Sequence, residues 1–230
     1  MTPQALARLM EATWPPARSW RVGPFRLRDG AGGGKRVSAA SAEGEWGAED
    51  IDAAEAAMDA PLFLLRPEDG ALDGALAGRG YRVIDPVVAY ACDVAALEPP
   101  RWFAAFPHWP PLQMAVDLWA EGHIGPARLA VMERVRGQKV AILARQDERP
   151  AGVAFVALGE GAAMLHALEV TPGLRRKGAA AAILRAAADW ARAQGAGELA
   201  LVVTEANQPA RALYEKLGMH EVGRYHYRVK

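Results

Sequence analysis

The sequence predicts an α/β (α+β) fold in which helices flank a mixed central sheet. Residues 139–170 contain three strand-like runs separated by short polar turns, a pattern typical of antiparallel strands. The last of these runs is followed by an alanine-rich helix and then by the apolar run 198–204. A strand, a crossover helix and a second strand in this order predict a right-handed parallel unit. The sheet is therefore expected to contain both antiparallel and parallel pairs.

The composition and charge of the chain exclude several classes of protein. The chain has 230 residues, is 51% hydrophobic, and carries 27 basic and 27 acidic residues, so no net charge would attract nucleic acid or an anionic membrane. A single cysteine, Cys92, excludes an internal disulfide framework and fits a reducing compartment. The N-terminal segment lacks the features of a signal peptide, and clustered Cys and His ligands for a metal are absent from the sequence. We expect a cytoplasmic protein with small-molecule partners, a monomer or homodimer without a metal.

The first part of the chain alternates between helices and strands. Apolar spacing, prolines and glycines predict helices over residues 4–13, 50–59 and 72–79. Strands are predicted over 20–28, 35–41 and 62–65, and the glycine-rich segment 29–34 would join the first two as a hairpin. Two more strand segments are predicted within 81–93, one on each side of Asp85-Pro86.

The second part begins with two helices, predicted over 112–121 and 127–136. Strands follow over 139–145, 153–158, 163–170 and 198–204. The alanine-rich helix starts after Gly178 and ends at Gly195. Asn207 is expected to cap a helix that Gly218 ends, and residues 219–230 are expected to form a closing pair of strands.

The turn before the alanine-rich helix has the features of a phosphate site. Arg175, Arg176 and Lys177 lie directly before Gly178, which opens the helix. The first N–H groups of a helix have no intrahelical acceptor, and the helix dipole favours an anion beside them. Glycine lets a ligand approach the main chain, and the small side chains of Ala179–Ala182 leave the helix start uncluttered. This stretch predicts binding of a pyrophosphate group.

Two motifs give this chain a family resemblance. Arg175-x-x-Gly178-x-Ala180 matches the (Gln/Arg)-x-x-Gly-x-(Gly/Ala) signature of the GNAT superfamily of acyl-coenzyme A N-acyltransferases. Asn207-x-x-Ala210-x-x-Leu213-Tyr214 resembles the second motif of that family, at the expected distance. The resemblance is close over the last third of the chain and looser over its C-terminal half. It implies a GNAT fold and an N-acetyltransferase that uses acetyl-CoA as acyl donor.

The resemblance also implies site residues. Backbone groups of Leu168, Glu169 and Val170 would pair with the pantetheine arm of acetyl-CoA and with its thioester carbonyl. The pyrophosphate would be bound by the turn and the helix start, at Arg175, Arg176, Lys177, Gly178, Ala179, Ala180 and Ala181. Asn207, Ala210 and Tyr214 would complete the cofactor site. Tyr214 is the expected general acid, which protonates the departing thiolate, although Tyr214 also belongs to an apolar helical stripe typical of a core residue.

The general base is not identified by the sequence. Positions that carry a glutamate in some protein-acetylating relatives are occupied here by Met164 and Val202. Glu169, His166 and Glu205 remain as candidates, with Glu169 chosen as the catalytic one, and strand alternation predicts that His166 and Glu169 face opposite ways. The family places the acceptor near the first two helices, which makes Trp109, Trp119, His108 and His123 candidate pocket residues. We expect a small amine or an N-terminal α-amine that loses its proton through water.

Element order suggests two units. Residues 1–94 repeat the closing order of a GNAT domain without the phosphate turn, so they are predicted to form a degenerate GNAT-like accessory half, and residues 95–230 the catalytic domain. The predicted function is acetyl transfer from acetyl-CoA to a primary amine of a small molecule or a protein N-terminus. The alternative is a non-catalytic acyl-CoA-binding regulatory protein, in which the cleft is kept and the base is absent.

Overall fold

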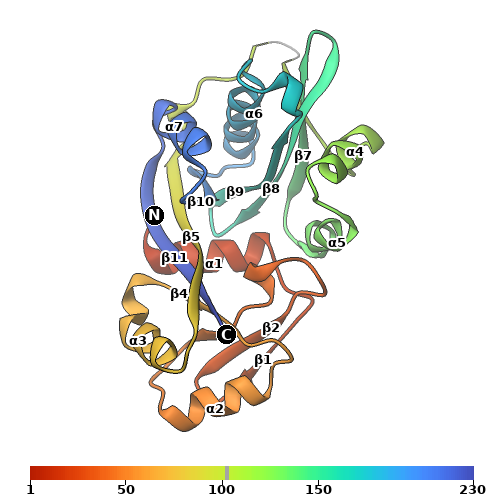
Figure 1. Cartoon of the computed structure of the whole chain (residues 1–230). Helices are drawn as coiled ribbons and strands as arrows, with labels where there is room; N and C mark the ends of the chain where they lie inside the picture. The colour runs from red at the N-terminus through yellow and green to blue at the C-terminus, as the bar shows by residue number, and fades with distance from the viewer. Residues whose placement is uncertain (102–103) are drawn as a thin grey trace.

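A computed structural model describes residues 1–101 and 104–230, and its centre is an eight-stranded sheet (Figure 1). The strand order is β4-β11-β5-β10-β9-β8-β7-β6, and β9 and β10 form the parallel pair. The strands are β4 (Leu62–Leu65), β5 (Arg82–Asp93), β6 (Ala105–His108), β7 (Lys139–Gln146), β8 (Arg149–Gly159), β9 (Ala162–Val170), β10 (Glu198–Thr204) and β11 (His220–Val229). The mixed sheet predicted from the sequence is confirmed.

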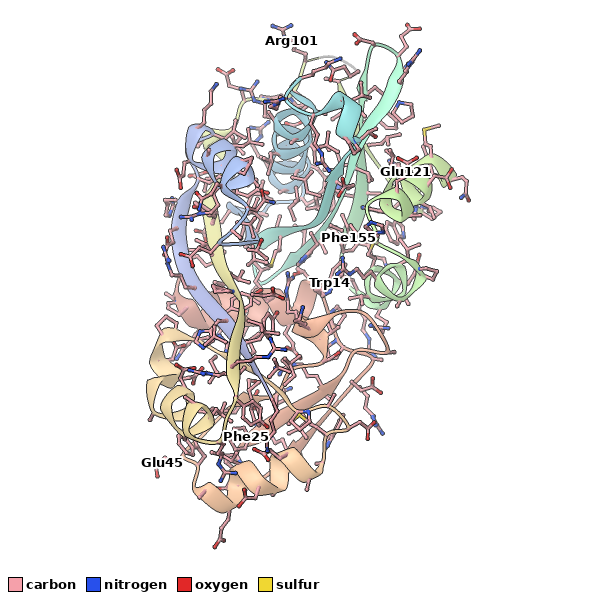
Figure 2. The ribbon with its side chains drawn as sticks, in the orientation of Figure 1. Trp14, Phe25, Glu45, Arg101, Glu121 and Phe155 are labelled. Carbon is pink, nitrogen blue, oxygen red and sulfur yellow. The ribbon has the colours of Figure 1, made fainter. Side chains whose placement is uncertain are left out.

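Helices cover both faces of this sheet. One face carries α6 (Ala179–Ala193) and α7 (Gln208–Lys216), whose apolar residues join a core cluster with Val156 and Leu165 of the sheet. The other face carries α1 (Pro3–Thr13), α4 (Gln113–Glu121) and α5 (Pro126–Arg134). Trp14, just after α1, meets Phe155 of β8 with ring centroids 6.1 Å apart near the middle of the molecule (Figure 2).

A smaller sheet lies at the end of the molecule that holds the C-terminal tip of β11 (Figure 1). It contains β1 (Arg18–Val22), β2 (Phe25–Asp29) and β3 (Ser41–Ala42), and α2 (Ala48–Ala56) and α3 (Gly70–Gly78) lie nearby. Phe25 is completely buried in this unit, in edge-to-face contact with Phe63 of β4. The smaller sheet therefore shares its core with an edge strand of the large one.

The predicted hairpin across the glycine-rich segment is wrong. The run 20–28 itself folds back at Gly23, which adopts a positive φ of 53°, so that β1 and β2 pair with each other. Lys35–Val37 forms a turn of 3₁₀-helix instead of a strand. Gly33 packs against Val131 of α5 so closely that a Cβ atom would lie 2.4 Å from the valine side chain. The segment thus makes a tertiary contact, a role that its local turn composition does not reveal.

Two strand predictions fail near the C-terminus and in the first half. The closing pair expected in 219–230 is a single strand, β11, because β5 and β4 supply its partners on both edges. The two segments expected in 81–93 are one strand, β5, with a bulge at Asp85-Pro86 opposite β11. The bulge accommodates a proline, which has no N–H for the ladder. The edge strand β6 contains Pro107, and a proline disfavours a strand prediction because it has no N–H for the ladder; the sequence therefore does not predict β6.

The large sheet crosses the predicted domain boundary, since β5 lies between β10 and β11. The division into residues 1–94 and 95–230 stays a prediction. Within the described part of the chain, none of the helices has the length and apolar character needed to cross a membrane.

A charged cluster joins β11 to α3. Arg228 donates from Nε to Asp73 Oδ1 at 2.7 Å and from Nη2 to Oδ2 at 3.1 Å, and His226 Nε2 lies 2.8 Å from Oδ1. The hydrogen bonds from Arg228, and then those from His226, lower the pKa of Asp73 to about 2. Because this pKa is depressed in the folded state, the cluster stabilises the fold above the ordinary Asp pKa, and the stabilisation is lost as the pH falls toward 2.

We predict that Asp73→Asn lowers the free energy of unfolding at pH 7 by about 1 kcal/mol, since solvent screens this partly exposed carboxylate. The difference in melting temperature between the variant and the wild type should shrink as the pH falls from about 4 to about 2. Asp52→Asn, which removes a more exposed partner of Arg79, is the matched control and should change stability less. A difference for Asp73→Asn that is unchanged at pH 2 would contradict this assignment.

Candidate active site

The predicted phosphate turn is present at the start of α6. Gly178 is the N-cap residue and adopts φ of 98°, a conformation that side-chain-bearing residues rarely adopt. Arg176 also has a positive φ, of 60°. The N–H of Ala182 is bonded to the Gly178 carbonyl at 2.9 Å, so the N–H groups of Ala179–Ala181 precede the regular helical bonds. The turn therefore presents a cluster of free backbone donors.

These donors face a cavity of about 1140 Å³ that we call the α6 cavity. Every cofactor residue predicted from the sequence lines it: Leu168, Glu169, Val170, Arg175, Arg176, Lys177, Gly178, Ala179, Ala180, Ala181, Asn207, Ala210 and Tyr214. The lining also contains cations that sequence reasoning missed: Arg101, Arg145, Arg185 and Lys216. These cations come from β7, α6, α7 and the segment before β6, so no local motif marks them. The cavity as a whole suits a ligand with several negative charges.

Strands β9 and β10 part at the edge of this cavity. They pair from Ala162 with Glu198 to Leu165 with Leu201, and the described pairing stops there although both strands continue. Beyond that point the edge of β9 that faces β10 has no ladder partner in the described chain. Unpaired backbone groups in a gap between two strands can form hydrogen bonds with an extended ligand. The ligand then takes the place of an additional strand.

A β-bulge sets the shape of this gap. Val153 and Phe155 of β8 pair with Glu169 and His166, so a step of two residues on β8 faces a step of three on β9. Ala167 takes up the extra length with a φ of 51°. The buried indole of Trp119 donates from Nε1 to the Ala167 carbonyl at 2.8 Å. A helix on the opposite side of the molecule from α6 thus fixes the bulge.

The bulge overturns one prediction. Strand alternation placed His166 and Glu169 on opposite faces, but the extra residue restores them to the same face, with their partners Phe155 and Val153. The two side chains nevertheless line different cavities. Their separation along the strand, rather than their direction, keeps them apart.

Arg175 anchors the end of β9. It donates from Nε to the Val170 carbonyl at 3.0 Å and from Nη2 to Glu169 Oε1 at 3.1 Å. The Val170 carbonyl, expected to be free for the pantetheine arm, is therefore already bonded. Glu169 is held as the partner of a cation, and its side chain is only 20% exposed. Glu205, another candidate base, pairs on the surface with Arg224 at 2.8 Å.

Tyr214 and Asn207 reach the α6 cavity from α7. Tyr214 is 5% exposed, and its ring lies 5.7 Å from the ring of Tyr90. Burial, with a further contribution from Tyr90, raises the pKa of Tyr214 to about 12, so the hydroxyl keeps its proton at neutral pH. Asn207 Oδ1 accepts from the N–H of Ala210 at 3.2 Å, which confirms the predicted helix cap. Both residues thus combine a structural role with a position at the cavity.

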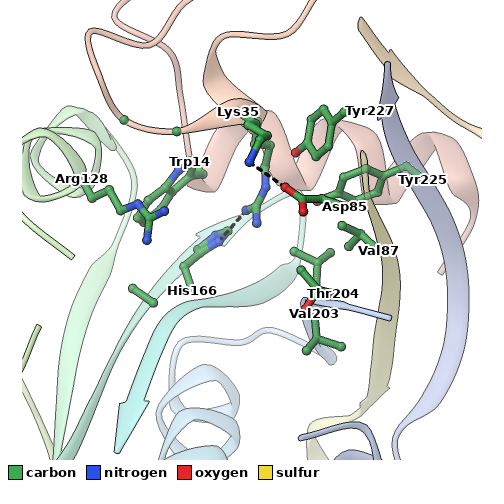
Figure 3. Close-up of a pocket in the computed structure, with 15 residues that line it drawn as sticks. Trp14, Lys35, Asp85, Val87, Arg128, His166, Val203, Thr204, Tyr225 and Tyr227 are labelled. Atoms are coloured by element: carbon green, nitrogen blue, oxygen red, sulfur yellow. Dashed lines mark hydrogen bonds and ion pairs between the residues drawn. The ribbon is translucent and has the colours of Figure 1, made fainter. Parts of the chain in front are cut away.

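A second cavity, of about 320 Å³, lies on the other face of the sheet (Figure 3). We call it the Arg36 cavity; its lining is Trp14, Gly33, Gly34, Lys35, Arg36, Asp85, Val87, Arg128, His166, Ala167, Val202, Val203, Thr204, Tyr225 and Tyr227. The bulge residue Ala167 lines this cavity, and its neighbour Leu168 lines the α6 cavity. The two cavities are therefore lined by neighbouring residues of β9 at the point where β9 and β10 part.

The Arg36 cavity could not be predicted from sequence motifs, because its residues come from both ends and the middle of the chain. Of the candidate acceptor residues, Trp109, Trp119, His108 and His123 are absent from the described lining of both cavities. Trp119 instead supports the bulge. The one signal that could have helped is Val202, a position already singled out on β10, which does line the Arg36 cavity.

His166 is held by a chain of hydrogen bonds. The Thr13 hydroxyl donates to the Leu9 carbonyl at 2.6 Å, so its oxygen accepts from His166 Nε2 at 2.9 Å. The lone pair of His166 Nδ1 then accepts from Arg36 Nη1 at 3.0 Å. Burial, and after it the charge of Arg36, holds the pKa of His166 well below its usual range. His166 is neutral with both nitrogens engaged, which leaves no lone pair for a general base.

The chain is similar in sequence and in structure to known acetyltransferases. A model of the acetyltransferase (GNAT) family matches residues 102–219. The chain is 24% identical to an uncharacterized N-acetyltransferase, YobR, of Bacillus subtilis, over 98% of this chain and 97% of that protein. A GCN5-related N-acetyltransferase from Kribbella flavida has a similar structure, with a TM-score of 0.75 at 19% identity, covering 100% of this chain and 96% of that one.

A tandem GNAT protein from the clavulanic acid biosynthesis pathway also has a similar structure. Its TM-score is 0.61 at 14% identity, over 90% of this chain and 77% of that one. These likenesses extend through the first half of the chain as well as the second. They confirm the predicted GNAT fold and the predicted likeness to a tandem arrangement.

We predict that millimolar acetyl-CoA raises the melting temperature of the wild type and that Gly178→Glu abolishes this rise. The substitution places a side chain and a negative charge beside the donors of the α6 turn. Gly161→Glu is the matched control, because Gly161 also has a positive φ and open space at its Cβ position but does not line the α6 cavity. Both variants should lose some stability from backbone strain. A folded Gly178→Glu protein with an unchanged acetyl-CoA shift would contradict this placement of the ligand.

Proposed function

The chain belongs to the acetyltransferase (GNAT) family, and from this premise we propose that it transfers an acetyl group from acetyl-CoA to a primary amine by direct attack. The observation that carries the proposal is that consecutive residues of β9, Ala167 and Leu168, line two different cavities beside the gap between β9 and β10. The cationic α6 cavity suits the phosphates of the donor. The smaller Arg36 cavity opens toward the same gap from the other face and suits the acceptor.

The donor site needs only groups already present. Arg176, Lys177 and the first N–H groups of α6 would hold the pyrophosphate, and Asn207 and Ala210 would flank the arm. Unpaired backbone groups of β9 near Leu168 would bind the arm and polarise the thioester carbonyl. Amides that point at this oxygen stabilise the oxyanion that forms when the amine attacks. The proposed chemistry is therefore positioning and electrostatic stabilisation.

Tyr214 is the proposed donor to the leaving thiolate. Its pKa of about 12 makes complete transfer to a thiolate unfavourable, by roughly 5 kcal/mol if the pKa of the thiol is near 8.5. The hydroxyl would therefore act mainly by donating a hydrogen bond to sulfur as the C–S bond breaks. The proton that finally reaches the thiol balances the one that the amine releases.

Removal of the amine proton is the less defined step. Glu169 is paired with Arg175, Glu205 with Arg224, and His166 has both nitrogens engaged. Among the described lining residues of the Arg36 cavity, Asp85 is the one carboxylate. Asp85 is itself paired with Lys35 at 2.6 Å, so we propose that the amine is deprotonated by water. An α-amine, with a pKa near 8, needs little assistance.

A panel of primary amines with acetyl-CoA tests the function, with free thiol as the readout. Thiol release that depends on the amine supports the enzyme, and acetyl-CoA binding without turnover on any amine would support the non-catalytic regulatory alternative. The panel should include small amines and peptides with a free N-terminus, because the acceptor class is the least constrained part of the proposal.

We predict that Tyr214→Phe lowers kcat by about ten- to a hundredfold, the range for one hydrogen bond to a charged group, with little change in acetyl-CoA binding. Tyr90→Phe is the matched control, since the Tyr90 hydroxyl bonds to Glu215 at 2.9 Å and Tyr90 does not line the α6 cavity. The control should lose stability while kcat stays near the wild-type value. Wild-type turnover in Tyr214→Phe would rule out the assigned role.

A further inference from the structure

The charges of the Arg36 cavity do not balance. Lys35 Nζ pairs with Asp85 Oδ2 at 2.6 Å, which leaves Arg36 and Arg128 as further cations of the lining (Figure 3). Within residues 1–101 and 104–230, neither arginine has a carboxylate partner. Arg128 is exposed at the side of the cavity formed by α5, whereas Arg36 lies deeper, against His166. The cavity therefore has an excess of positive charge.

The position of Arg36 is costly for the folded protein. Its Nε is buried and makes no hydrogen bond within the described chain. Its Nη1 donates to a histidine that is itself neutral, and its other close polar neighbours are the hydroxyls of Tyr225 and Tyr227, so no carboxylate compensates for the loss of hydration. Arg36 is half-buried, and a cation that loses much of its hydration without gaining a counter-charge destabilises a protein unless a ligand supplies that charge. This arrangement indicates that the missing partner is an anionic ligand.

The surroundings of Arg36 orient it for such a ligand. The chain from Leu9 through Thr13 and His166 fixes which nitrogen of the imidazole accepts from Arg36. Only one of the five N–H groups of the guanidinium is used by this bond. A guanidinium held in this way matches the two oxygens of a carboxylate, which it can bind through parallel hydrogen bonds.

The rest of the cavity limits the size of the ligand. A volume of about 320 Å³ is at the lower end of small-molecule sites. Ala167, Val202 and Val203 form an apolar side next to the strand gap, where the amine would meet the acetyl group. The amine and the anionic group of the ligand must both fit within this short span.

We infer that the acceptor is a small amine that carries a carboxylate, and that Arg36 binds this carboxylate while the amine reaches the gap beside Ala167. This inference rests on the proposed function and names its substrate class. In the reaction the amine nitrogen forms a C–N bond to the acetyl carbon and the C–S bond of the thioester breaks. The amine loses one proton to water, and the thiolate gains one, which gives the N-acetylated acid and free CoA.

Matched pairs of amines test the inference. Each pair consists of an amino acid and its carboxamide, with glycine, β-alanine, γ-aminobutyrate and the larger α-amino acids covering a range of spacings. We expect the wild type to acetylate the preferred carboxylate with a kcat/KM at least tenfold above that of its carboxamide. Arg36→Met should lower kcat/KM for the carboxylate about ten- to a hundredfold more than it lowers kcat/KM for the carboxamide, so that the preference disappears.

Three further variants keep the experiment decisive. Arg134→Met is the matched control, because Arg134 is a half-buried arginine that donates only to the carbonyls of Pro15 and Gly30 and lines neither cavity. It should keep the preference. Arg36→Lys keeps the charge but not the paired donors and should retain part of the preference. Arg128→Met alters an exposed residue, so it should fold normally and reduce the preference more weakly.

The outcomes separate this inference from the proposed function. If carboxamides, simple alkylamines or peptide N-termini are acetylated as well as carboxylates, the carboxylate site is wrong and the acetyltransferase proposal stands. A preference that persists in Arg36→Met would also overturn it. If acetyl-CoA raises the melting temperature but no amine of any class is acetylated, the proposed function fails, and the inference fails with it.

Discussion

The separation of β9 from β10 is the constraint on which the rest of this site depends. Two parallel strands that stayed paired to their ends would close the sheet between the two cavities. Here the ladder stops at Leu165 and Leu201, and the bulge at Ala167 turns β9 away. The indole of Trp119 donates to the carbonyl of the bulge, so a helix on the face opposite α6 fixes the shape of the gap that the donor would enter under the proposed function.

Both cavities carry an excess of positive charge, although the formal net charge of the protein is zero. The α6 cavity gathers cations from the turn, from α6 and from the ends of β7 and α7, while its one described lining carboxylate, Glu169, is paired with Arg175. The Arg36 cavity has a smaller excess of positive charge in a more confined space. A multiply charged donor and a singly charged acceptor would suit these two regions in turn.

How far the sequence predicted the site depends on how local each part is. The phosphate turn is specified by consecutive residues, from Arg175 to Ala181, and the structure places all of them along one cavity. The Arg36 cavity is assembled from the residue after α1, a 3₁₀ turn and the glycines before it, α5, β5, β9, β10 and β11, and no pattern of spacing links these segments. Its assembly depends on β5 lying between β10 and β11, a pairing of distant strands that propensity does not encode.

The sequence predictions that were wrong failed because they, too, depend on contacts between distant parts of the chain or on local irregularities of the backbone. The alternation argument for His166 and Glu169 assumed a regular strand, and an alanine at a positive φ leaves no mark in the sequence. The strand expected after Gly34 became a 3₁₀ turn because Gly33 packs against α5. In this 3₁₀ turn Arg36 reaches His166, whereas the sequence predicts residues 35–41 as one strand of a hairpin in the accessory half.

A crystal structure of the protein with bound CoA would test the central claim most directly. We expect the pyrophosphate to lie against the N–H groups at the start of α6. We expect the thiol to lie in the gap between β9 and β10 beside Ala167, open to the Arg36 cavity. A CoA molecule bound on another surface, or one whose thiol is separated from the Arg36 cavity by a closed sheet, would contradict the account.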